Sequence, residues 1–345
     1  MKQNKAKQLS KFTIGYIGLG KMGLNMACNM AENGHTVIAN NRSPDPIKKA
    51  VKHGAQAAYN TKELFEKIKE NLKRKKQTKK IIWIMLPAGD ITENKIKEIT
   101  PFLKRGDILI DGSNSIYKDA IRRSKNLYKK GINFVDVGVS GGPRGARHGA
   151  CMMVGGSKNI FNYLKPLFTS LCVSYGVEHF NGPGAGHYVK MVHNGIEYGI
   201  MESLAEGFEI LKKSRFDLNL MKVSRVYNHG SIIESKLMTT LHKAFHKHGN
   251  SLVDVPGRAG QGGSAAGGKV KAEADWTLDE AKVLKVHYHA IGGAVIERAE
   301  SREKPSYRGK IINAVRNQFG GHSLKTAKDS VKKKKLKNKK SKKQK

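Results

Sequence analysis

The first half of the chain alternates short apolar runs with longer amphipathic segments. The runs are rich in Ile, Val, Phe and Ala, and the segments between them repeat apolar positions at helical spacing. We expect strands at residues 12–17, 36–39, 81–86, 107–111 and 133–139, and helices at residues 21–33, 44–53, 61–71, 93–100 and 117–129. Strands that alternate with helices pair in parallel, so the pattern predicts an α/β Rossmann-type, doubly wound sheet.

The second half of the chain has a helical rhythm. No proline occurs from residue 187 to 213, and Val189, Val192, Ile196 and Ile200 follow helical spacing. This predicts one long helix, and we expect further helices at residues 218–226, 232–247, 278–285, 289–301 and 307–318. The chain is thus predicted to contain a Rossmann domain over residues 12–182 and an all-α domain over residues 183–328.

The two ends of the chain are lysine-rich. Ten lysines and no acid lie in residues 332–345, and four lysines lie in residues 2–11. Such segments cannot bury a core, so residues 1–11 and 329–345 are predicted to be disordered. Residues 255–269, which are rich in Gly, Ala and Ser, are expected to form a flexible loop.

The charge of the chain is strongly positive. It has 64 Lys and Arg against 28 Asp and Glu, a net charge of +36, and subtracting the fourteen terminal lysines still leaves +22. Such a field attracts anions of every kind, including phosphorylated substrates and nucleic acid. A lysine-biased proteome with solvated surface lysines would give the same composition.

The cysteines and the apolar runs argue against a disulfide-stabilised, zinc-binding, membrane-spanning or secreted protein. Cys28, Cys151 and Cys172 form no CxxC pair, so neither a disulfide framework nor a zinc site is indicated. No apolar run approaches the roughly 20 residues that span a bilayer, and residues 1–11 lack the apolar core of a secretory signal. We expect a cytoplasmic protein with no membrane contact, although the lysine-rich tail also fits a nuclear-localisation signal.

A glycine-rich turn follows the first predicted strand. Gly18, Gly20 and Gly23 form G-x-G-x-x-G and lead into a predicted helix, which is the context of a dinucleotide-binding turn. The glycines allow the backbone to approach a pyrophosphate closely, and the helix N-terminus offers free N–H groups.

The end of the second predicted strand bears on the choice of cofactor. It reads Asn41, Arg42 and Ser43, with no acid before Asp45. An acid there would bind the ribose hydroxyl of NAD, whereas an arginine suits the 2′-phosphate of NADP. NADP is therefore favoured over NAD, and a surface role for Arg42, stacked on adenine, stays open.

One polar stripe lies on the long predicted helix. Lys190, Asn194 and Glu197 are spaced i, i+4 and i+7, so they share a face. The outer two are two turns apart, roughly 10 Å. A small substrate on this face could touch an amine at one end and a carboxyl at the other, which suits oxidation at one carbon and protonation at another. A solvated stripe on an amphipathic helix is the alternative.

Five motifs follow one another along residues 12–323. They read I-G-L-G-K-M-G-L-N-M at residues 17–26, D-G-S-N-S at 111–115, V-S-G-G at 139–142, G-H-Y-V-K-M-V-H-N-G-I-E-Y at 186–198 and R-N-Q-F-G-G-H at 316–322. Together they resemble the signature of the 6-phosphogluconate dehydrogenases, within the β-hydroxyacid dehydrogenase superfamily. His193 and Glu197 are the specific part, and the length of the chain resembles the short form of the family.

The resemblance implies a reaction and its residues. The reaction is oxidative decarboxylation of 6-phosphogluconate to ribulose 5-phosphate and CO2 in the pentose phosphate pathway, with reduction of NADP or NAD and no metal. By similarity, Lys190 takes the proton of the 3-hydroxyl and Glu197 protonates C1 of the enediol. Implied substrate contacts are Asn114, Ser140, Gly141, Gly142, His193, Asn194, Tyr198, Arg316 and His322. Implied cofactor contacts are Gly18, Leu19, Gly20, Lys21, Met22, Gly23, Asn41, Arg42, Ser43, Leu86, Pro87, Ala88 and Asn114.

The resemblance also implies an assembly. In this family a neighbouring subunit lends the residues that match Arg316 and His322, so a homodimer or homotetramer is expected.

The sequence departs from the family at Glu234. The family normally has an arginine there, and a carboxylate would repel the substrate phosphate. Lys236 or Lys269 could supply another cation.

Two other functions stay open. One is a different β-hydroxyacid dehydrogenase, acting on another small hydroxyacid. The other is a nucleic-acid-associated protein with a retained dehydrogenase fold, bound through its basic tail and through K-R-K-K-Q-T-K-K at residues 73–80.

Overall fold

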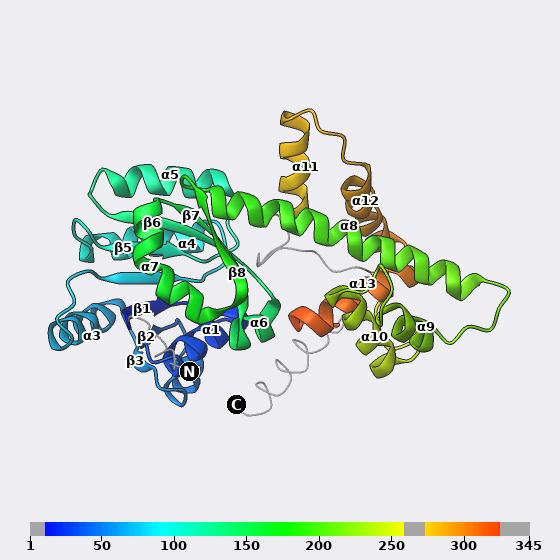
Figure 1. The fold of residues 1–345 in the computed structure, drawn as a ribbon, viewed down its shortest axis with the longest axis horizontal. Coiled ribbons are helices and arrows are strands. Elements are labelled where there is room, and N and C mark those ends of the chain that lie inside the picture. Colours follow the sequence, from blue (N-terminus) through cyan, green and yellow to red (C-terminus); the bar gives the residue numbers. More distant parts are fainter. Residues whose placement is uncertain (1–10, 259–272, 325–345) are drawn as a thin grey trace, which may run out of the picture. The chain divides into compact units, whose positions relative to one another are not determined.

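The computed structural model describes residues 11–258 and 273–324. Contacts divide the chain into two compact units, one that ends at His193 and one that begins at Asn194. The long helix α8 (Ala185–Lys213) contains the point of division. The two units are described in turn (Figure 1).

An eight-stranded sheet forms the first unit, in the order β3-β2-β1-β4-β5-β6-β7-β8. Every neighbouring pair is parallel except β6 and β7. From β1 the chain first adds β2 and β3 on one side, and then returns to add β4 and the later strands on the other side. A doubly wound sheet binds its ligand at such a reversal, beside the carboxyl end of its first strand. The strands are β1 (Thr13–Ile17), β2 (Thr36–Asn40), β3 (Gln56–Ala58), β4 (Ile81–Ile84), β5 (Ile108–Asp111), β6 (Asn133–Ser140), β7 (Ala150–Gly156) and β8 (Cys172–Asn181).

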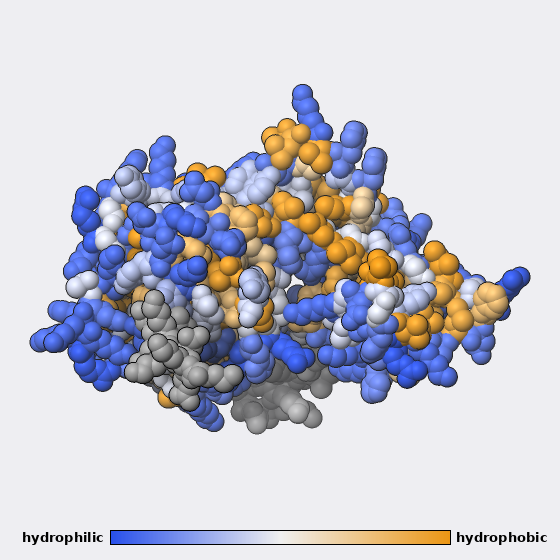
Figure 2. Space-filling view, in the orientation of Figure 1, coloured by the Kyte–Doolittle hydropathy of each residue, from blue (hydrophilic) through white to orange (hydrophobic). Residues whose placement is uncertain are grey.

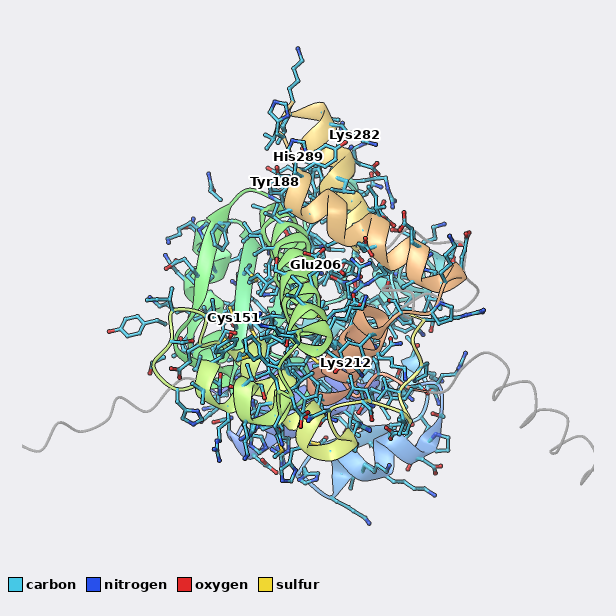
Figure 3. The ribbon with its side chains drawn as sticks, turned by 90° about the vertical axis from the view of Figure 1, so that its right-hand side faces the viewer. Cys151, Tyr188, Glu206, Lys212, Lys282 and His289 are labelled. Carbon is cyan, nitrogen blue, oxygen red and sulfur yellow. The ribbon has the colours of Figure 1, made fainter. Side chains whose placement is uncertain are left out.

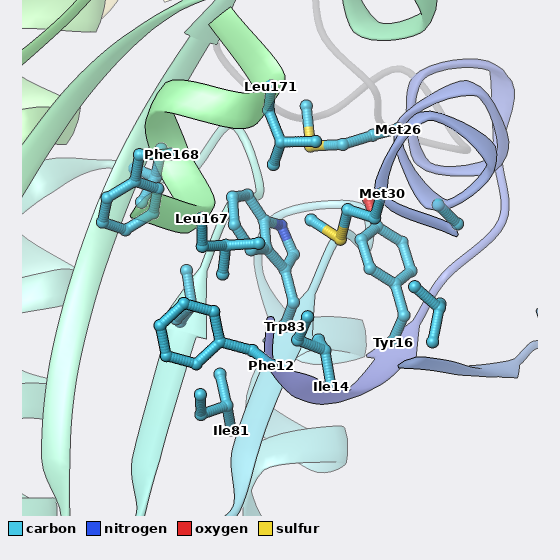
Figure 4. Packing of buried hydrophobic residues seen from close by; sticks show 14 of the residues in the cluster. Phe12, Ile14, Tyr16, Met26, Met30, Ile81, Trp83, Leu167, Phe168 and Leu171 are labelled. Atoms are coloured by element: carbon cyan, nitrogen blue, oxygen red, sulfur yellow. The ribbon is translucent and has the colours of Figure 1, made fainter. Parts of the chain in front are cut away.

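Helices cover both faces of this sheet. They are α1 (Lys21–Glu32), α2 (Pro44–Val51), α3 (Thr61–Arg74), α4 (Asp90–Ile99), the short 3-10 helix η1 (Thr100–Phe102), α5 (Tyr117–Tyr128), α6 (Gly142–His148) and α7 (Lys158–Leu171). On one face, Tyr16 and Trp83 pack against Met30 of α1 and Phe168 of α7 (Figure 4). On the other face, the strands pack against Leu64 of α3 and its neighbours. The predicted doubly wound fold is confirmed.

The first turn of α8 is fixed to the sheet of this unit by one carboxylate. Asp136 of β6 is fully buried, and it accepts hydrogen bonds from the backbone N–H of Gly184 at 2.7 Å and of His187 at 2.8 Å. Gly186 lies so close to β6 and β7 that an added Cβ would stand 2.6 Å from the backbone nitrogen of Gly155. An acidic side chain at a helix N-terminus satisfies free N–H groups and suits the helix dipole.

The described part of the second unit is built from helices only. They are the rest of α8, α9 (Leu220–Tyr227), α10 (Lys236–His248), α11 (Glu273–Val283), α12 (His289–Glu303) and α13 (Tyr307–Gly320). Phe208 of α8, Phe245 of α10 and Ile311 of α13 share its apolar core. Glu206 and Lys212 lie on the C-terminal half of α8 (Figure 3), and the Lys212 ammonium stands 3.9 Å from the centroid of the Tyr307 ring.

The elements differ from the sequence prediction in a few places. The prediction missed β3 and the run from α6 to β8, and it began α10 too early. Residues 231–234 form a turn, and α10 starts only after Ser235, whose hydroxyl accepts a hydrogen bond from the Met238 N–H at 3.0 Å. The contact division lies inside α8, so the predicted domain limits stay a prediction. The predicted disordered ends, Lys11 apart, and residues 259–269 lie outside the described residues.

None of the helices in the described ranges combines the length and apolarity that a bilayer crossing requires.

Candidate active site

The glycine-rich turn lies between β1 and α1, at the carboxyl edge of the sheet. Gly18 has a φ of +101°, and a side chain there would collide with the Met85 carbonyl oxygen. A side chain at Gly23 would collide with the Gly18 carbonyl oxygen, whereas a Cβ at Gly20 would meet no atom within 4 Å. The first turn of α1 carries no acid. These features leave the α1 N-terminus open to an anionic pyrophosphate.

Asn41 holds the end of β2, where the sequence indicated the choice between NAD and NADP. Its side-chain oxygen accepts a hydrogen bond from the Leu19 N–H at 3.0 Å, and its amide donates to the Ser43 carbonyl at 3.2 Å. Asn41 therefore joins the end of β2 to the glycine-rich turn. Arg42 and Ser43 are exposed beside it.

A buried polar network fixes the loop that carries Asn114. The Arg123 guanidinium donates to the Asp111 carboxylate at 2.6 Å and to the Ser115 hydroxyl at 3.1 Å. Asp111 also accepts from the Ser113 N–H at 3.0 Å. The loop of residues 85–88, which carries Leu86, Pro87 and Ala88, follows the neighbouring strand β4, and its residues are partly buried. Sequence reasoning missed Arg123, because nothing in the pattern of α5 distinguishes it from exposed Arg122.

Three polar groups line up at the start of α8 in the first unit. The Lys190 ammonium nitrogen lies 3.2 Å from Nδ1 of His193, and Nε2 of His193 lies 3.1 Å from the Ser140 hydroxyl. When Lys190 donates to Nδ1, His193 carries its proton on Nε2 and donates to Ser140. Gly138 of β6 faces Lys190 so closely that an added Cβ would collide with the Lys190 side chain. The next residues after Ser140 are Gly141 and Gly142, at φ +117° and +64°.

In the second unit, Tyr198 lies under a buried arginine. Asn194 and Tyr198 are buried, and Glu197 is partly buried. The Arg298 guanidinium of α12 lies 3.6 Å from the centroid of the Tyr198 ring. Arg298 is 3% exposed, and its Nε and Nη1 have no hydrogen-bond partner among the described residues. Sequence reasoning missed this arginine, because one cation in a charged helix gives no signal.

Glu234, which replaces the phosphate-binding arginine of the family, lies at the surface, and so does Lys236. Glu234 is exposed in a local turn, where its carboxylate accepts a hydrogen bond from the Gly230 N–H at 2.8 Å. Lys236 is also exposed, and Lys269 lies outside the described residues.

The last motif spans the end of α13. Arg316 is 6% exposed, whereas His322 is exposed just after the helix. The His322 carbonyl accepts a hydrogen bond from the Asn317 side chain at 2.7 Å, and Gly321 ends the helix at φ +61°. The expectation that Arg316 and His322 contribute to the substrate site of a neighbouring subunit stays a prediction.

A dinucleotide-binding turn on a doubly wound sheet, followed by a helical unit, defines the class of protein. The chain is an NAD(P)-dependent oxidoreductase, and the comparisons with known proteins agree. Residues 13–177 match the model of the NAD binding domain of 6-phosphogluconate dehydrogenase, and residues 186–215 match the model of its C-terminal domain. The chain belongs to the 6-phosphogluconate dehydrogenase family.

Three relatives support this assignment. YqeC of Bacillus subtilis, whose own naming as a 6-phosphogluconate dehydrogenase is provisional, is 37% identical over 90% of this chain and 98% of YqeC. The NAD(+)-dependent, decarboxylating 6-phosphogluconate dehydrogenase of Haloferax volcanii is 33% identical over 90% of this chain and 98% of its own. The solved 6-phosphogluconate dehydrogenase of Plasmodium falciparum is 29% identical with a TM-score of 0.73, covering 85% of this chain and 62% of that one.

Proposed function

We propose that the protein oxidises and decarboxylates 6-phosphogluconate to ribulose 5-phosphate and CO2. The observation that carries this proposal is the line of Lys190, His193 and Ser140 at the start of α8. The same helix continues to Asn194 and Glu197, at the spacing that oxidation and reprotonation of one small substrate require.

In the first step Lys190, as the uncharged amine, takes the proton of the substrate 3-hydroxyl. The bound nicotinamide cofactor supplies the hydride acceptor for the same carbon. His193 stands within hydrogen-bond distance of the Lys190 nitrogen, so it holds the amine in place through this transfer. Asn194, one turn along the helix, and Ser140, with Gly141 and Gly142, orient the substrate hydroxyls and carboxylate.

In the second step the 3-keto acid loses CO2. The bond from C2 to the carboxylate carbon breaks, and its electron pair moves into an enediol whose oxygen is hydrogen-bonded by protonated Lys190. Glu197 then donates a proton to the enediol carbon, which gives the ketose product. Two helical turns, roughly 10 Å, separate the base from the acid, so each reaches a different end of the reacting carbons.

For the phosphate end of the substrate we propose Arg298, with Tyr198 beneath it. A buried guanidinium with two nitrogen donors that lack a hydrogen-bond acceptor is costly unless an anion pairs with it. Bidentate pairing with phosphate is what this side chain does well. Glu234 bonds to its own turn at the surface, so it need not oppose the phosphate.

For the cofactor we propose NADP, with Gly18, Leu19, Gly20, Lys21, Met22 and Gly23 around the pyrophosphate and Arg42 on the 2′-phosphate. Exposed Arg42 and the lack of an acid in residues 40–44 support this choice. Leu86, Pro87, Ala88 and Asn114 follow the neighbouring strands at the same edge of the sheet, where they can contact the nicotinamide half.

The test is absorbance at the wavelength of reduced nicotinamide, with release of CO2 measured in parallel. Wild type with 6-phosphogluconate and NADP should give both signals in equal amounts. Lys190→Ala should abolish both, and the matched surface variant Lys222→Ala should keep both. Turnover of an unphosphorylated hydroxyacid, with none of 6-phosphogluconate, would instead identify a different β-hydroxyacid dehydrogenase.

A further inference from the structure

The edge of the sheet opposite the glycine-rich turn is strongly basic. β1, β4, β5 and β6 are parallel neighbours, so the turns that precede them meet at one edge. We call this surface the amino edge, and define it by residue 11, residues 73–80, residues 104–107 and residues 128–131, with Tyr163 of α7 beside them. The cofactor turn follows β1 at the other end of the same strands.

Hydrogen bonds hold these turns side by side. The Gln77 side chain donates to the Lys11 carbonyl at 2.7 Å. The Lys80 N–H donates to Asp107 at 2.9 Å, and the Gly106 N–H donates to the Gly131 carbonyl at 2.9 Å. The four turns therefore form one continuous ridge. Three strand spacings separate its ends, roughly 14 Å.

Positive charge is concentrated on this ridge. Its turns hold eleven Lys and Arg and one acid, Asp107. Asp107 is buried and already paired with Lys80 at 3.1 Å, so it does not offset the exposed cations. Partial burial lowers the pKa of Lys75, and the charge of neighbouring Arg74 lowers it further. In Figure 2 the surface over α3 is drawn in the blue of hydrophilic residues.

Aromatic rings accompany the cations at both ends of the ridge. Tyr128, next to Lys129 and Lys130, is 81% exposed. At the other end, Tyr163 is 40% exposed and lies 4.6 Å from the Lys79 ammonium. A basic track with open aromatic rings is how proteins bind single strands, because phosphates meet the cations and bases stack on the rings.

We propose that the amino edge binds single-stranded nucleic acid. The exposed Lys and Arg side chains of residues 73–76, 104–105 and 129–130 contact the phosphates, and Tyr128 stacks on a base. A ridge of roughly 14 Å is long enough to meet several successive phosphates of one strand. This binding is independent of the dehydrogenase reaction, because the cofactor turn lies at the opposite edge of the sheet.

The experiment measures fluorescence anisotropy of a labelled oligouridylate with the full-length chain at several salt concentrations. Lys104→Ala, Arg105→Ala, Lys129→Ala and Lys130→Ala are combined in one variant. The control combines Lys222→Ala, Arg225→Ala, Lys243→Ala and Lys247→Ala, which are exposed in the second unit and remove the same charge. Both variants keep residues 332–345, so the tail contributes equally.

The amino-edge variant should bind at least about tenfold more weakly than the control, and its salt slope should fall by up to about 3, since each single-strand phosphate contact adds about 0.7. Tyr128→Ala should weaken binding roughly 5- to 100-fold, whereas Tyr128→Phe should keep it, because the ring does the stacking. Turnover of 6-phosphogluconate should be the same in all of these variants.

Three outcomes would overturn the proposal. Equal weakening in the two four-site variants would assign the binding to overall charge. Unchanged binding in Tyr128→Ala, or tighter binding to a duplex of the same length, would remove the stacking site. Amino-edge-dependent binding to vesicles of anionic phospholipid, without binding to oligouridylate, would assign the edge to a membrane surface. None of these results depends on whether 6-phosphogluconate is the substrate.

Discussion

Two buried arginines show how a single residue's surroundings indicate its role. Arg123 and Arg298 are 2% and 3% exposed. Arg123 forms ion pairs with the Asp111 and Glu93 carboxylates, each at 2.6 Å, inside the first unit. Arg298 meets an aromatic ring, and its buried Nε and Nη1 have no hydrogen-bond partner among the described residues. A buried cation whose carboxylate partners are in place holds a fold together, whereas a buried cation that meets only an aromatic ring favours an incoming anion. We expect Arg123 to serve stability and Arg298 to serve substrate binding.

Replacing Arg298 tests this distinction. Arg298→Met should raise KM for 6-phosphogluconate about 10- to 150-fold, because hydrogen bonds to a charged group contribute about 1.5–3 kcal/mol. The Tm should stay the same or rise, because an apolar chain of similar length replaces a buried charge. Arg225→Met, which replaces an exposed arginine of α9, serves as the control. A fall in Tm with an unchanged KM would show a structural arginine instead.

Arg42 is the residue on which cofactor choice depends. Arg42→Ser should raise KM for NADP about tenfold or more and leave KM for NAD within twofold, because only NADP carries the 2′-phosphate. Lys49→Ser removes an equal charge from the nearby exposed face of α2 and should change neither value. The measurement is initial rate against each cofactor. An equal loss with both cofactors would contradict a role at the 2′-phosphate.

At the scale of elements, α8 depends on Asp136 for its start. Asp136→Ala removes the acceptor of two backbone N–H groups and should lower the free energy of unfolding by about 2–3 kcal/mol. Activity should fall as well, because the same turn aligns Lys190. Asp136→Asn keeps one acceptor oxygen and should lose less. Asp45→Ala, an exposed acid in the first turn of α2, should cost little. Urea unfolding and turnover, measured on the same samples, check both effects.

Three of the elements that sequence reasoning missed, α6, α7 and β8, lack a regular pattern of apolar positions. The helix α6 has two glycines and a proline in seven residues, and α7 contains Pro166, so both break the helical pattern. The strand β8 has no regular alternation of buried and exposed positions, so period two is absent from its sequence. By contrast, β1 and β4 are buried on both faces, and their continuous apolar runs predicted them.

Some features of the candidate site could be predicted from the sequence, and others could not. Motifs along the chain identified Lys190, His193 and Glu197, because these residues lie close together in sequence. The approach of Ser140 to His193, and of Arg298 to Tyr198, depends on tertiary packing between distant segments. No pattern within one segment could have predicted these contacts.

At the scale of the whole molecule, positive and negative charges are concentrated in different places. The sheet offers its carboxyl edge to a cofactor and its amino edge to a polyanion. In the second unit, several carboxylates lie beside few cations. Arg308 of α13 forms ion pairs with Glu209 of α8 at 3.0 Å and with Glu297 of α12 at 2.8 Å. These ion pairs join three helices, and Glu202 is buried beside them without a full partner among the described residues.

Glu202 should make the stability of the chain depend on pH. Burial, and then the negative charge of Glu297, raises the pKa of Glu202 from its ordinary value of 4.5 to about 7, although the charges of Arg308 and Arg298 oppose the shift. The folded state therefore binds a proton that the unfolded state has released, and stability falls as pH rises from about 4.5 to about 7. Below this window both states are protonated, and the stabilisation is fully present.

Glu202→Gln removes this titration and keeps the shape of the neutral acid. The variant should match wild type near pH 4.5 and exceed it near pH 8 by roughly 2 kcal/mol, because wild type must then ionise a buried carboxyl group. Urea midpoints by far-ultraviolet circular dichroism at the two pH values measure the difference. Glu300→Gln, exposed on α12, is the matched control and should track wild type at both. Parallel curves for Glu202→Gln and wild type would mean that Glu202 ionises as readily in the folded chain as in the unfolded one.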